Sequence, residues 1–377
     1  MTPCLPLIAV ATLVTGLVGV PQPWVVAMSA VSGPPAPGSP SPGPGTPGHP
    51  APGPGSSGTA VPATPAGPAS DIVEHVATTA LDSYWTPERM ARAIPIDLLS
   101  TIKQVGMAAA LILPSPAASP APSRSPGAAP AGARLVRQAR QERRTGASLA
   151  VTSGSKWAAG GAVTRTTGRV FLTMDGIDFV CSASAVRSAN KDVVVTAGHC
   201  VKDGTGSWAE NWTFVPGYRA GQRPYGAYTA RRMFVAGPWA RGGNDDYDMG
   251  MVAVTMADGR HLGDAVGGQE IGFNVRRGLR TYGFGFPADP PYNGEHLLYC
   301  AGVVRADSQG QTRDQGLRCD LTAGASGGPW LSGFDPATGR GRLTSVSSFK
   351  YSNDHRTMYG PYFGAAARDL FQAAQRA

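Results

Sequence analysis

From about residue 168 to the C-terminus, short apolar runs alternate with turns rich in Gly, Pro and Asp. The apolar runs at 169–174 and 177–181 flank an Asp-Gly dipeptide, a pattern that predicts a β-hairpin. Nine further strands are expected, at 192–196, 212–215, 230–235, 249–254, 279–284, 296–304, 329–332, 342–349 and 358–363. The first long helical pattern of this block comes at 365–377. Many short strands joined by turns predict an all-β sandwich or a pair of barrels.

A shorter segment, 71–113, carries helix signals instead. Thr86 stands at an N-cap position and Pro87 follows it, so we expect a helix at 88–93. The stretch 71–76 opens with an acidic residue that would suit the start of another helix. The segment is too short to be an independent enzyme domain, and we interpret it as a small helical pro-segment.

Composition distinguishes the segments with predicted strands and helices from the Pro-rich linkers between them. The chain has 377 residues with 50 Gly and 34 Pro, and residues 31–70 alone hold 13 Pro and 9 Gly. Because Pro donates no backbone hydrogen bond and Gly loses the most entropy on ordering, 31–70 is expected to be a disordered linker. A second Pro- and Ala-rich linker, 114–147, contains an Arg cluster at 137–144. This cluster is either a proteolytic processing site or a positively charged, soluble linker. The block left to fold is 148–377.

The first 30 residues form a separate unit. Residues 5–20 are mostly apolar, and small residues suited to cleavage follow at 25–27 and 28–30. We interpret 1–30 as a secretory signal peptide. The alternative is an N-terminal membrane anchor, for which the apolar run is short and interrupted. We therefore expect a secreted, extracellular protein without stable membrane association after the signal is removed.

Cysteine usage agrees with export. Cys4 would leave with the signal peptide, which leaves Cys181, Cys200, Cys300 and Cys319 and three ways to pair them. Disulfides imply an oxidising compartment. There is no C-x-x-C pair, so a zinc ribbon is not supported, and we expect neither a metal site nor a cofactor.

Charge narrows the classes of partner. The net charge is +8, but charged residues make up 15% of the chain and hydrophobic residues 42%, which excludes a chain that is disordered throughout. The C-terminal block is mildly basic and has neither a Lys/Arg run nor an aromatic-basic motif. We therefore expect a solvated surface and no nucleic-acid partner.

Three segments carry residue types suited to nucleophilic catalysis. His199 ends a β-branched run, beside a cysteine. Glycines surround Ser326 in the segment GASGGP, where they allow a sharp bend and let amide N–H groups point at an oxyanion. Asp248 directly precedes an apolar strand, and Asp246, two residues earlier with the same strand parity, is its rival.

In this order, the segments TAGHC, DMGMVAV and GASGGP resemble the trypsin/chymotrypsin-type serine proteases. The closer resemblance is to secreted bacterial members, the glutamyl-endopeptidase-like or V8-like branch, and it covers roughly 168–377. It implies two six-stranded antiparallel β-barrels with a short C-terminal helix. The segment YWTPERM at 84–90 also resembles pro-region sequence found upstream of such domains.

The resemblance implies a role for each candidate. His199 would be the general base, Ser326 the nucleophile that forms an acyl-enzyme, and Asp248 the carboxylate that orients His199. The backbone N–H groups of Gly324 and Ser326 would form the oxyanion hole. The substrates would be proteins or peptides, and the enzyme a monomer.

The resemblance also implies the disulfide pairing. Cys181–Cys200 matches the disulfide that commonly staples the His loop in this clan. Cys300–Cys319 would staple the segment that leads to the Ser loop.

Several positions depart from the animal members of the clan. Ala325 stands where those enzymes carry an Asp that pairs with a freed N-terminus, so a latent precursor would instead be masked by 71–113. Ser347 stands where glutamate-specific members often place a His, so strict Glu specificity is not expected. Ser348 and Phe349 would occupy the substrate-pairing strand.

The selector of the substrate side chain has two candidates. Asp320 lies six residues before Ser326, where an Asp at a pocket floor would pair with Arg or Lys. Bacterial relatives also use an Asp-Leu near this position as a structural element. Thr322 is the alternative, as a pocket-wall residue.

Two other classes of function are alternatives to an active protease. The first is a catalytically silent, secreted binding protein on the same fold, which usually arises by loss of a triad residue, yet all three candidates are present. The second is a surface-displayed adhesin on a Pro/Gly stalk, for which the sequence offers no C-terminal sorting signal.

Overall fold

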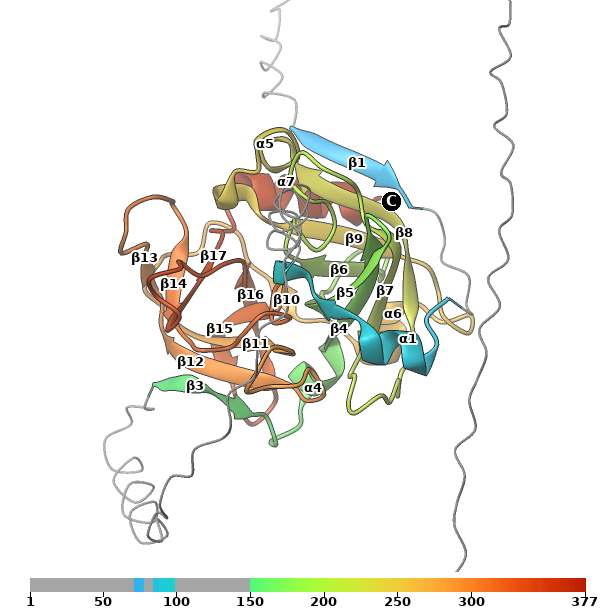
Figure 1. Ribbon diagram of the computed structural model, residues 1–377, viewed down its shortest axis with the longest axis horizontal. Helices are drawn as coiled ribbons and strands as arrows, with labels where there is room; N and C mark the ends of the chain where they lie inside the picture. The colour runs from blue at the N-terminus through green and yellow to red at the C-terminus, as the bar shows by residue number, and fades with distance from the viewer. Residues whose placement is uncertain (1–70, 78–83, 99–149) are drawn as a thin grey trace, which may run out of the picture. The chain divides into compact units, whose positions relative to one another are not determined.

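The computed structural model describes residues 71–77, 84–98 and 150–377 (Figure 1). The predicted signal peptide at 1–30, the linker at 31–70 and the Arg cluster at 137–144 lie outside the described residues. Most of the regular secondary structure in the described part is strand, which confirms the all-β class. No helix within it combines the length and the apolar character that crossing a bilayer would need.

Six strands close the first barrel. The predicted hairpin is present, and its turn residues Asp175 and Gly176 have φ of 51° and 78°, the left-handed conformation that a tight hairpin turn requires. The ring runs through β4 (Thr167–Met174), β5 (Ile177–Ala185), β6 (Val193–Thr196), β9 (Gly250–Val254), β8 (Tyr228–Ala236) and β7 (Glu210–Pro216), and then returns to β4. All eight residues of β4 are buried, because the barrel core covers one face of this strand and other parts of the chain cover the second.

The second half contains two sheets. The larger has the strand order β10 (Glu270–Ile271), β16 (Arg340–Val346), β15 (Pro329–Asp335), β11 (Arg280–Gly285), β12 (Leu298–Val303) and β3 (Val151–Lys156). The smaller consists of β13 (Arg305–Ala306), β14 (Gln315–Arg318) and β17 (Thr357–Gly360). A disulfide joins Cys300 of β12 to Cys319, the residue after β14, and thereby ties the two sheets together.

The helices of the described part are short. Three brief ones connect strands: α4 (Ala162–Thr166), α5 (Gly237–Gly242) and α6 (Leu262–Val266). The longest described helix is α7 (Ala365–Ala374), which confirms the helix expected at the C-terminus. Its residues Ala367 and Leu370 are fully buried in the main core, so α7 is part of the packed fold.

Residues 84–98 pack on the first barrel. Thr86 caps α1 (Pro87–Arg92) by accepting a hydrogen bond from the Arg89 amide, as the sequence predicts. The chain continues as β2 (Ile94–Pro95), which adds to the barrel beside β5, and then as the 3-10 turn η1 (Ile96–Leu98).

The helix expected at 71–76 is wrong. This stretch is the strand β1 (Ile72–Val76), which runs antiparallel to β8 with Ile72 opposite Ala236 and Val76 opposite Arg232 (Figure 1). The free edge of β8 offers unpaired backbone groups, and a β-branched sequence satisfies them better as a strand than as a helix. Asp71 does not cap a helix, because its carboxylate pairs with Arg241.

Candidate active site

Ser326 lies in a tight loop before β15. Gly324 and Gly327 on either side of it have φ of 91° and 79°, a conformation that other residues rarely adopt. A Cβ on Gly327 would overlap the Thr196 hydroxyl and the Ser182 carbonyl, so this position requires glycine. The Ser182 amide donates to the Ser326 carbonyl at 2.8 Å and pins the loop to β5. The backbone around the serine is therefore fixed by packing on the first barrel.

His199 follows β6 and lies against Asp248, which precedes β9. His199 Nδ1 and Asp248 Oδ2 are 2.8 Å apart, and the His199 backbone amide donates to Oδ1 at 2.7 Å. The Ser348 hydroxyl also donates to Oδ2. Asp248 is only 2% exposed. Burial raises its pKa, but the charge of His199 and the three hydrogen bonds outweigh burial and lower the pKa overall. Asp248 is therefore an ionised carboxylate that fixes the ring of His199.

Asp246, the rival acidic residue, faces elsewhere. Its two carboxylate oxygens accept from the backbone N and the Nε of Arg313, at 2.6 and 2.7 Å. The structure thus brings Asp248 to His199 and leaves Asp246 in an ion pair with a loop of the second half.

A carboxylate that the sequence did not single out faces the serine. Ser326 Oγ donates to Asp97 Oδ1 at 2.8 Å, and the Gly324 amide donates to Asp97 Oδ2 at 3.1 Å. Within the described residues, His199 Nε2 has no hydrogen-bond partner. The serine hydroxyl therefore bonds to the carboxylate of Asp97 and not to the imidazole.

The charge of His199 follows from these neighbours. Burial by itself would lower its pKa, but the charge and hydrogen bond of Asp248, together with the charges of Asp97 and Asp245, raise the pKa to about 9. In this arrangement the imidazole is protonated at neutral pH. A protonated imidazole cannot accept the serine proton.

A cleft of about 340 Å³ opens beside His199. Phe349 and Trp239 line it together with Lys350. The ammonium of Lys350 donates to the carbonyls of Cys319 and His355, at 2.9 and 2.6 Å. Burial lowers the pKa of Lys350 to about 8, although nearby carboxylates oppose this shift. The sequence prediction missed Lys350, even though it follows Phe349 directly.

The predicted substrate-binding residues divide into two groups. Phe349 lines the cleft, and the hydroxyl of Ser348 is engaged with Asp248. Asp320 Oδ1 accepts from the Gly154 amide at 2.6 Å, which ties β3 into the second half. Asp320 thus accepts a backbone hydrogen bond from β3, as a structural residue would.

Thr322 and Asp320 both bond to the loop that follows β11. The Tyr292 hydroxyl donates to Asp320 Oδ1 at 3.0 Å, and the Thr322 hydroxyl donates to the Asp289 carbonyl at 2.7 Å. Neither Asp320 nor Thr322 lines the cleft beside His199.

Both disulfide pairings implied by the sequence resemblance are present. Cys181 of β5 is joined to Cys200, the residue after His199. The bond links the strand that pins the serine loop to the turn that carries the imidazole. The second bond, Cys300–Cys319, lies next to Asp320.

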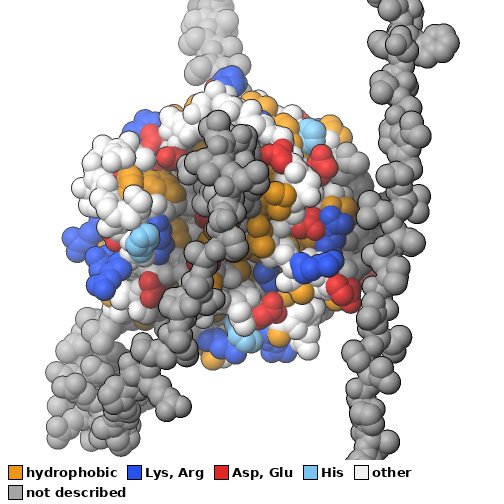
Figure 2. Space-filling view, viewed as in Figure 1, with side chains coloured by type: hydrophobic (Ala, Val, Ile, Leu, Met, Phe, Trp, Pro, Cys, Tyr) orange, Lys and Arg blue, Asp and Glu red, His pale blue; other side chains and the backbone are white. Residues whose placement is uncertain are grey.

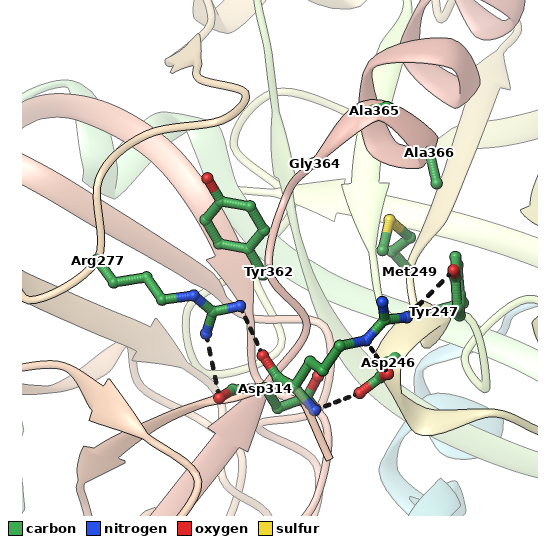
Figure 3. Close-up of a pocket in the computed structure, with 10 residues that line it drawn as sticks. Asp246, Tyr247, Met249, Arg277, Asp314, Tyr362, Gly364, Ala365 and Ala366 are labelled. Atoms are coloured by element: carbon green, nitrogen blue, oxygen red, sulfur yellow. Dashed lines mark hydrogen bonds and ion pairs between the residues drawn. The ribbon is translucent and has the colours of Figure 1, made fainter.

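A second acid-lined pocket, of about 270 Å³, is formed in part by Asp246, Tyr247 and Met249, which flank Asp248 (Figure 3). Asp314 in this pocket is 1% exposed, and neither of its carboxyl oxygens has a hydrogen-bond partner among the described residues. Burial, reinforced by neighbouring acidic charges, raises the pKa of Asp314 to about 8. Asp314 is therefore a neutral acid at pH 7.

Comparison with known proteins gives partial matches among curated sequences. No family model matches the chain. The chain is 30% identical over 103 residues to the extracellular metalloprotease of Bacillus subtilis, which spans 27% of this chain and 33% of that protein. It is 38% identical over 71 residues to the glutamyl endopeptidase of Bacillus licheniformis, which spans 19% of this chain and 22% of that protein. The matches thus cover about a third and about a fifth of these relatives.

Solved structures match over almost their whole length. The protease Anisep from Arthrobacter nicotinovorans is 38% identical, with a TM-score of 0.55, over 59% of this chain and 99% of that one. The thermostable serine protease AL20 from an extremophilic microorganism is 35% identical, with a TM-score of 0.54, over 57% of this chain and 99% of that one. The chain belongs to the trypsin-like serine proteases of bacteria. The family and the chymotrypsin-like fold predicted from the sequence are confirmed.

One relative is named a metalloprotease, which makes the metal-binding capacity of this chain relevant. The described residues contain one group of ligand-type side chains, Cys181, His199 and Cys200. The two sulfur atoms are bonded to each other, and Nδ1 of His199 is hydrogen-bonded to Asp248. These atoms do not fit a metal site, which needs thiolates and free ring nitrogens.

On the face drawn in Figure 2, acidic and basic side chains of the described residues are interspersed around more apolar surface. Opposite charges are often neighbours on this face. Such mixed charge is the distribution expected of a solvated protein surface.

Proposed function

We propose that the chain is a secreted serine endopeptidase that hydrolyses peptide bonds through His199, Asp248 and Ser326. The observation that supports this most strongly is the ion pair of His199 with buried Asp248, next to a serine held in a glycine loop. These three residue types, in this chain order and with the carboxylate buried against the imidazole, support the assignment of a catalytic triad.

In the proposed reaction, Ser326 Oγ attacks the carbonyl carbon of the scissile bond as His199 Nε2 accepts the hydroxyl proton. The negative charge that forms on the carbonyl oxygen is stabilised by the backbone N–H groups of Gly324 and Ser326. His199 then gives its proton to the leaving amine, and an acyl-enzyme remains on Ser326. Water, deprotonated by His199, attacks the ester and releases the acid.

Asp248 acts by position and charge. It binds His199 through Nδ1, which leaves Nε2 as the nitrogen for the serine proton, and it stabilises the imidazolium that forms in each step. The Ser348 hydroxyl and the His199 amide keep Asp248 in place. We propose that Phe349 lines the site where the substrate side chain binds.

Proteolysis of casein by the processed protein tests this function. We expect Ser326→Ala and His199→Ala each to lower kcat by several orders of magnitude. Exposed residues of the same types give matched controls: Ser153→Ala and His355→Ala should retain wild-type rates. If Ser326→Ala cleaves casein as fast as the wild type, the proposed role of Ser326 fails. If the processed wild type does not cleave casein at all, the catalytically silent binding protein becomes the better assignment.

Export is part of the proposal. The apolar run at 5–20 and the two disulfides support a secreted protein. Expression in a bacterial host should place the protein in the medium with a new N-terminus at or before residue 31. Recovery of the uncleaved chain in the membrane fraction would favour the anchor instead.

A further inference from the structure

Residues 84–98, called the clasp below, are fastened to the first barrel by one charged anchor. Arg89 donates from Nε and Nη2 to the two carboxylate oxygens of Asp178 in β5, at 2.5 and 3.0 Å. The guanidinium lies 3.8 Å from the ring centre of Tyr84, whose hydroxyl is hydrogen-bonded to Thr173 of β4. A bidentate pair of this kind fixes orientation as well as position.

A tryptophan forms the second anchor. Trp85 is 4% exposed, its Nε1 donates to the Asn211 carbonyl of β7 at 2.7 Å, and its ring packs on Phe171. Arg223 donates to the Trp85 carbonyl at 2.9 Å. Met90 of α1 is buried against the same core. A buried Trp with its N–H satisfied is typical of a residue that dominates the energy of an interface.

The clasp then follows β5 toward the serine loop. Its residues Ile94 and Pro95 pair in parallel with Phe179 and Val180. Ile96 is buried, and Asp97, the next residue, is exposed at the mouth of the cleft. The path is therefore set by the two anchors and the short strand, and Asp97 is delivered at its end.

Asp97 forms hydrogen bonds with the two groups that would meet the substrate carbonyl in the proposed reaction, the nucleophile and an oxyanion-hole amide. One oxygen accepts the Ser326 hydroxyl and the other accepts the Gly324 amide, an oxyanion-hole donor. A carboxylate that binds both in this way occupies the position of a product acid. Its charge also favours the protonated form of His199, which cannot act as a base.

We propose that the clasp is an inhibitor built into the precursor, with the Asp97 carboxylate in the place of the substrate carbonyl. The inference rests on the proposed function and adds how the site is regulated. Nothing covalent holds the clasp to residues 150–377 except the chain between 98 and 150. Cleavage in that connection therefore leaves the clasp bound, and activity requires that the clasp dissociate or be digested.

The test is the rate at which a fluorophosphonate probe labels Ser326 in the uncleaved chain. The rate is read from the full-length band on a gel, so that processed molecules do not contribute. We expect Asp97→Ala to be labelled at least tenfold faster than the wild type. Asp97→Asn, which keeps an acceptor oxygen but loses the charge, should be intermediate. Because Asp97 is exposed, neither change threatens the fold.

Glu88→Gln is the matched control, since it makes the same carboxylate-to-amide change at an exposed site in the clasp. It should be labelled within twofold of the wild type. The inference is overturned if Asp97→Ala is labelled at the wild-type rate, or if Glu88→Gln accelerates labelling as much as Asp97→Asn does.

The anchor gives an independent second test. Arg89→Glu and Asp178→Arg should each accelerate labelling of the uncleaved chain, and the double variant, which restores an opposite-charge pair, should slow labelling again. Arg92→Ala, a charge removal at an exposed position of α1, should have no effect. Unchanged rates in both single variants would contradict the anchor and the clasp.

Failure of the clasp can be told apart from failure of the enzyme. If processed protein is labelled at Ser326 but Asp97→Ala does not accelerate labelling of the precursor, the inhibitor inference falls and the protease remains. If the processed protein is not labelled at Ser326, the proposed function is wrong, and the inhibitor inference, which depends on it, is wrong as well.

Discussion

Two buried aspartates, in the cleft and in the pocket of Figure 3, differ in what surrounds them. Asp248 in the cleft and Asp314 in the pocket are 2% and 1% exposed. The oxygens of Asp248 accept hydrogen bonds from His199 and Ser348, and its pKa is lowered. Neither oxygen of Asp314 has a partner among the described residues, and its pKa is raised to about 8. Partners, rather than depth, therefore decide which carboxyl is charged.

Asp248 and Asp314 therefore suit different roles. An ionised carboxylate can orient an imidazole and stabilise its protonated form, so Asp248 suits the reaction. A neutral, unpartnered acid cannot do this, and it destabilises the fold wherever pH forces it to ionise.

The largest effect is expected from Asp248→Asn. Loss of the charge and of the acceptor for His199 Nδ1–H should lower kcat by about 10³–10⁴-fold, with little change in KM. The measurement is steady-state hydrolysis of a peptide substrate by the processed protein. The control is Asp246→Asn, which breaks an ion pair with Arg313 that is exposed on the arginine side and should change kcat less than threefold. Equal losses in the two variants would mean that Asp248 has no special role.

Asp314→Asn should raise stability, and more so at high pH. In the folded state the pKa of Asp314 is about 8, against an ordinary value of 3.8, so the folded state binds its proton more tightly than the unfolded state. Stability contributed by that proton is present below pH 4 and is lost as pH rises through 8. The amide variant should gain up to about 5 kcal/mol at pH 9, and close to nothing from this cause at pH 4.

Denaturant unfolding at pH 4, 7 and 9 measures this difference. Asp258→Asn, at an exposed turn, is the control and should follow the wild type at each pH. A gain that is the same at pH 4 and pH 9 would show that Asp314 does not titrate as described.

Ser348→Ala should have the smallest of the three effects. Removing one charge-assisted hydrogen bond to Asp248 should lower kcat about tenfold and raise the pKa of Asp248. The pH–rate profile of the processed protein should then lose activity at a higher pH on its acid side. A rise in KM with unchanged kcat would instead place Ser348 in substrate binding.

Much of the fold could be predicted from the sequence because local signals and tertiary packing favour the same structure. The Asp-Gly turn of the first hairpin and the Thr-Pro start of α1 each satisfy a local backbone requirement. Residues 71–76 could not be assigned in this way, because the edge of β8 that makes them a strand is more than 150 residues away in the chain. The strand β14 was also not predicted, since its short sequence has no alternating pattern.

The site divides along the same line. His199, Asp248 and Ser326 stand in motifs whose neighbours reveal them. Asp97 has no such motif, and its meeting with Ser326, 229 residues later, depends on the anchors at Trp85 and Arg89. The sequence does not reveal Asp314 for a similar reason. Its carboxyl group is unusual only because no hydrogen-bond donor of the described residues lies beside it in the folded chain.

The most direct test of the central claim is to locate a fluorophosphonate adduct on the processed protein by peptide mass spectrometry. The account predicts one adduct, on Ser326, whose formation is abolished by His199→Ala and persists in His355→Ala. An absent adduct, or one on another serine with Ser326 unmodified, would contradict the claim that this chain is a serine protease acting through Ser326.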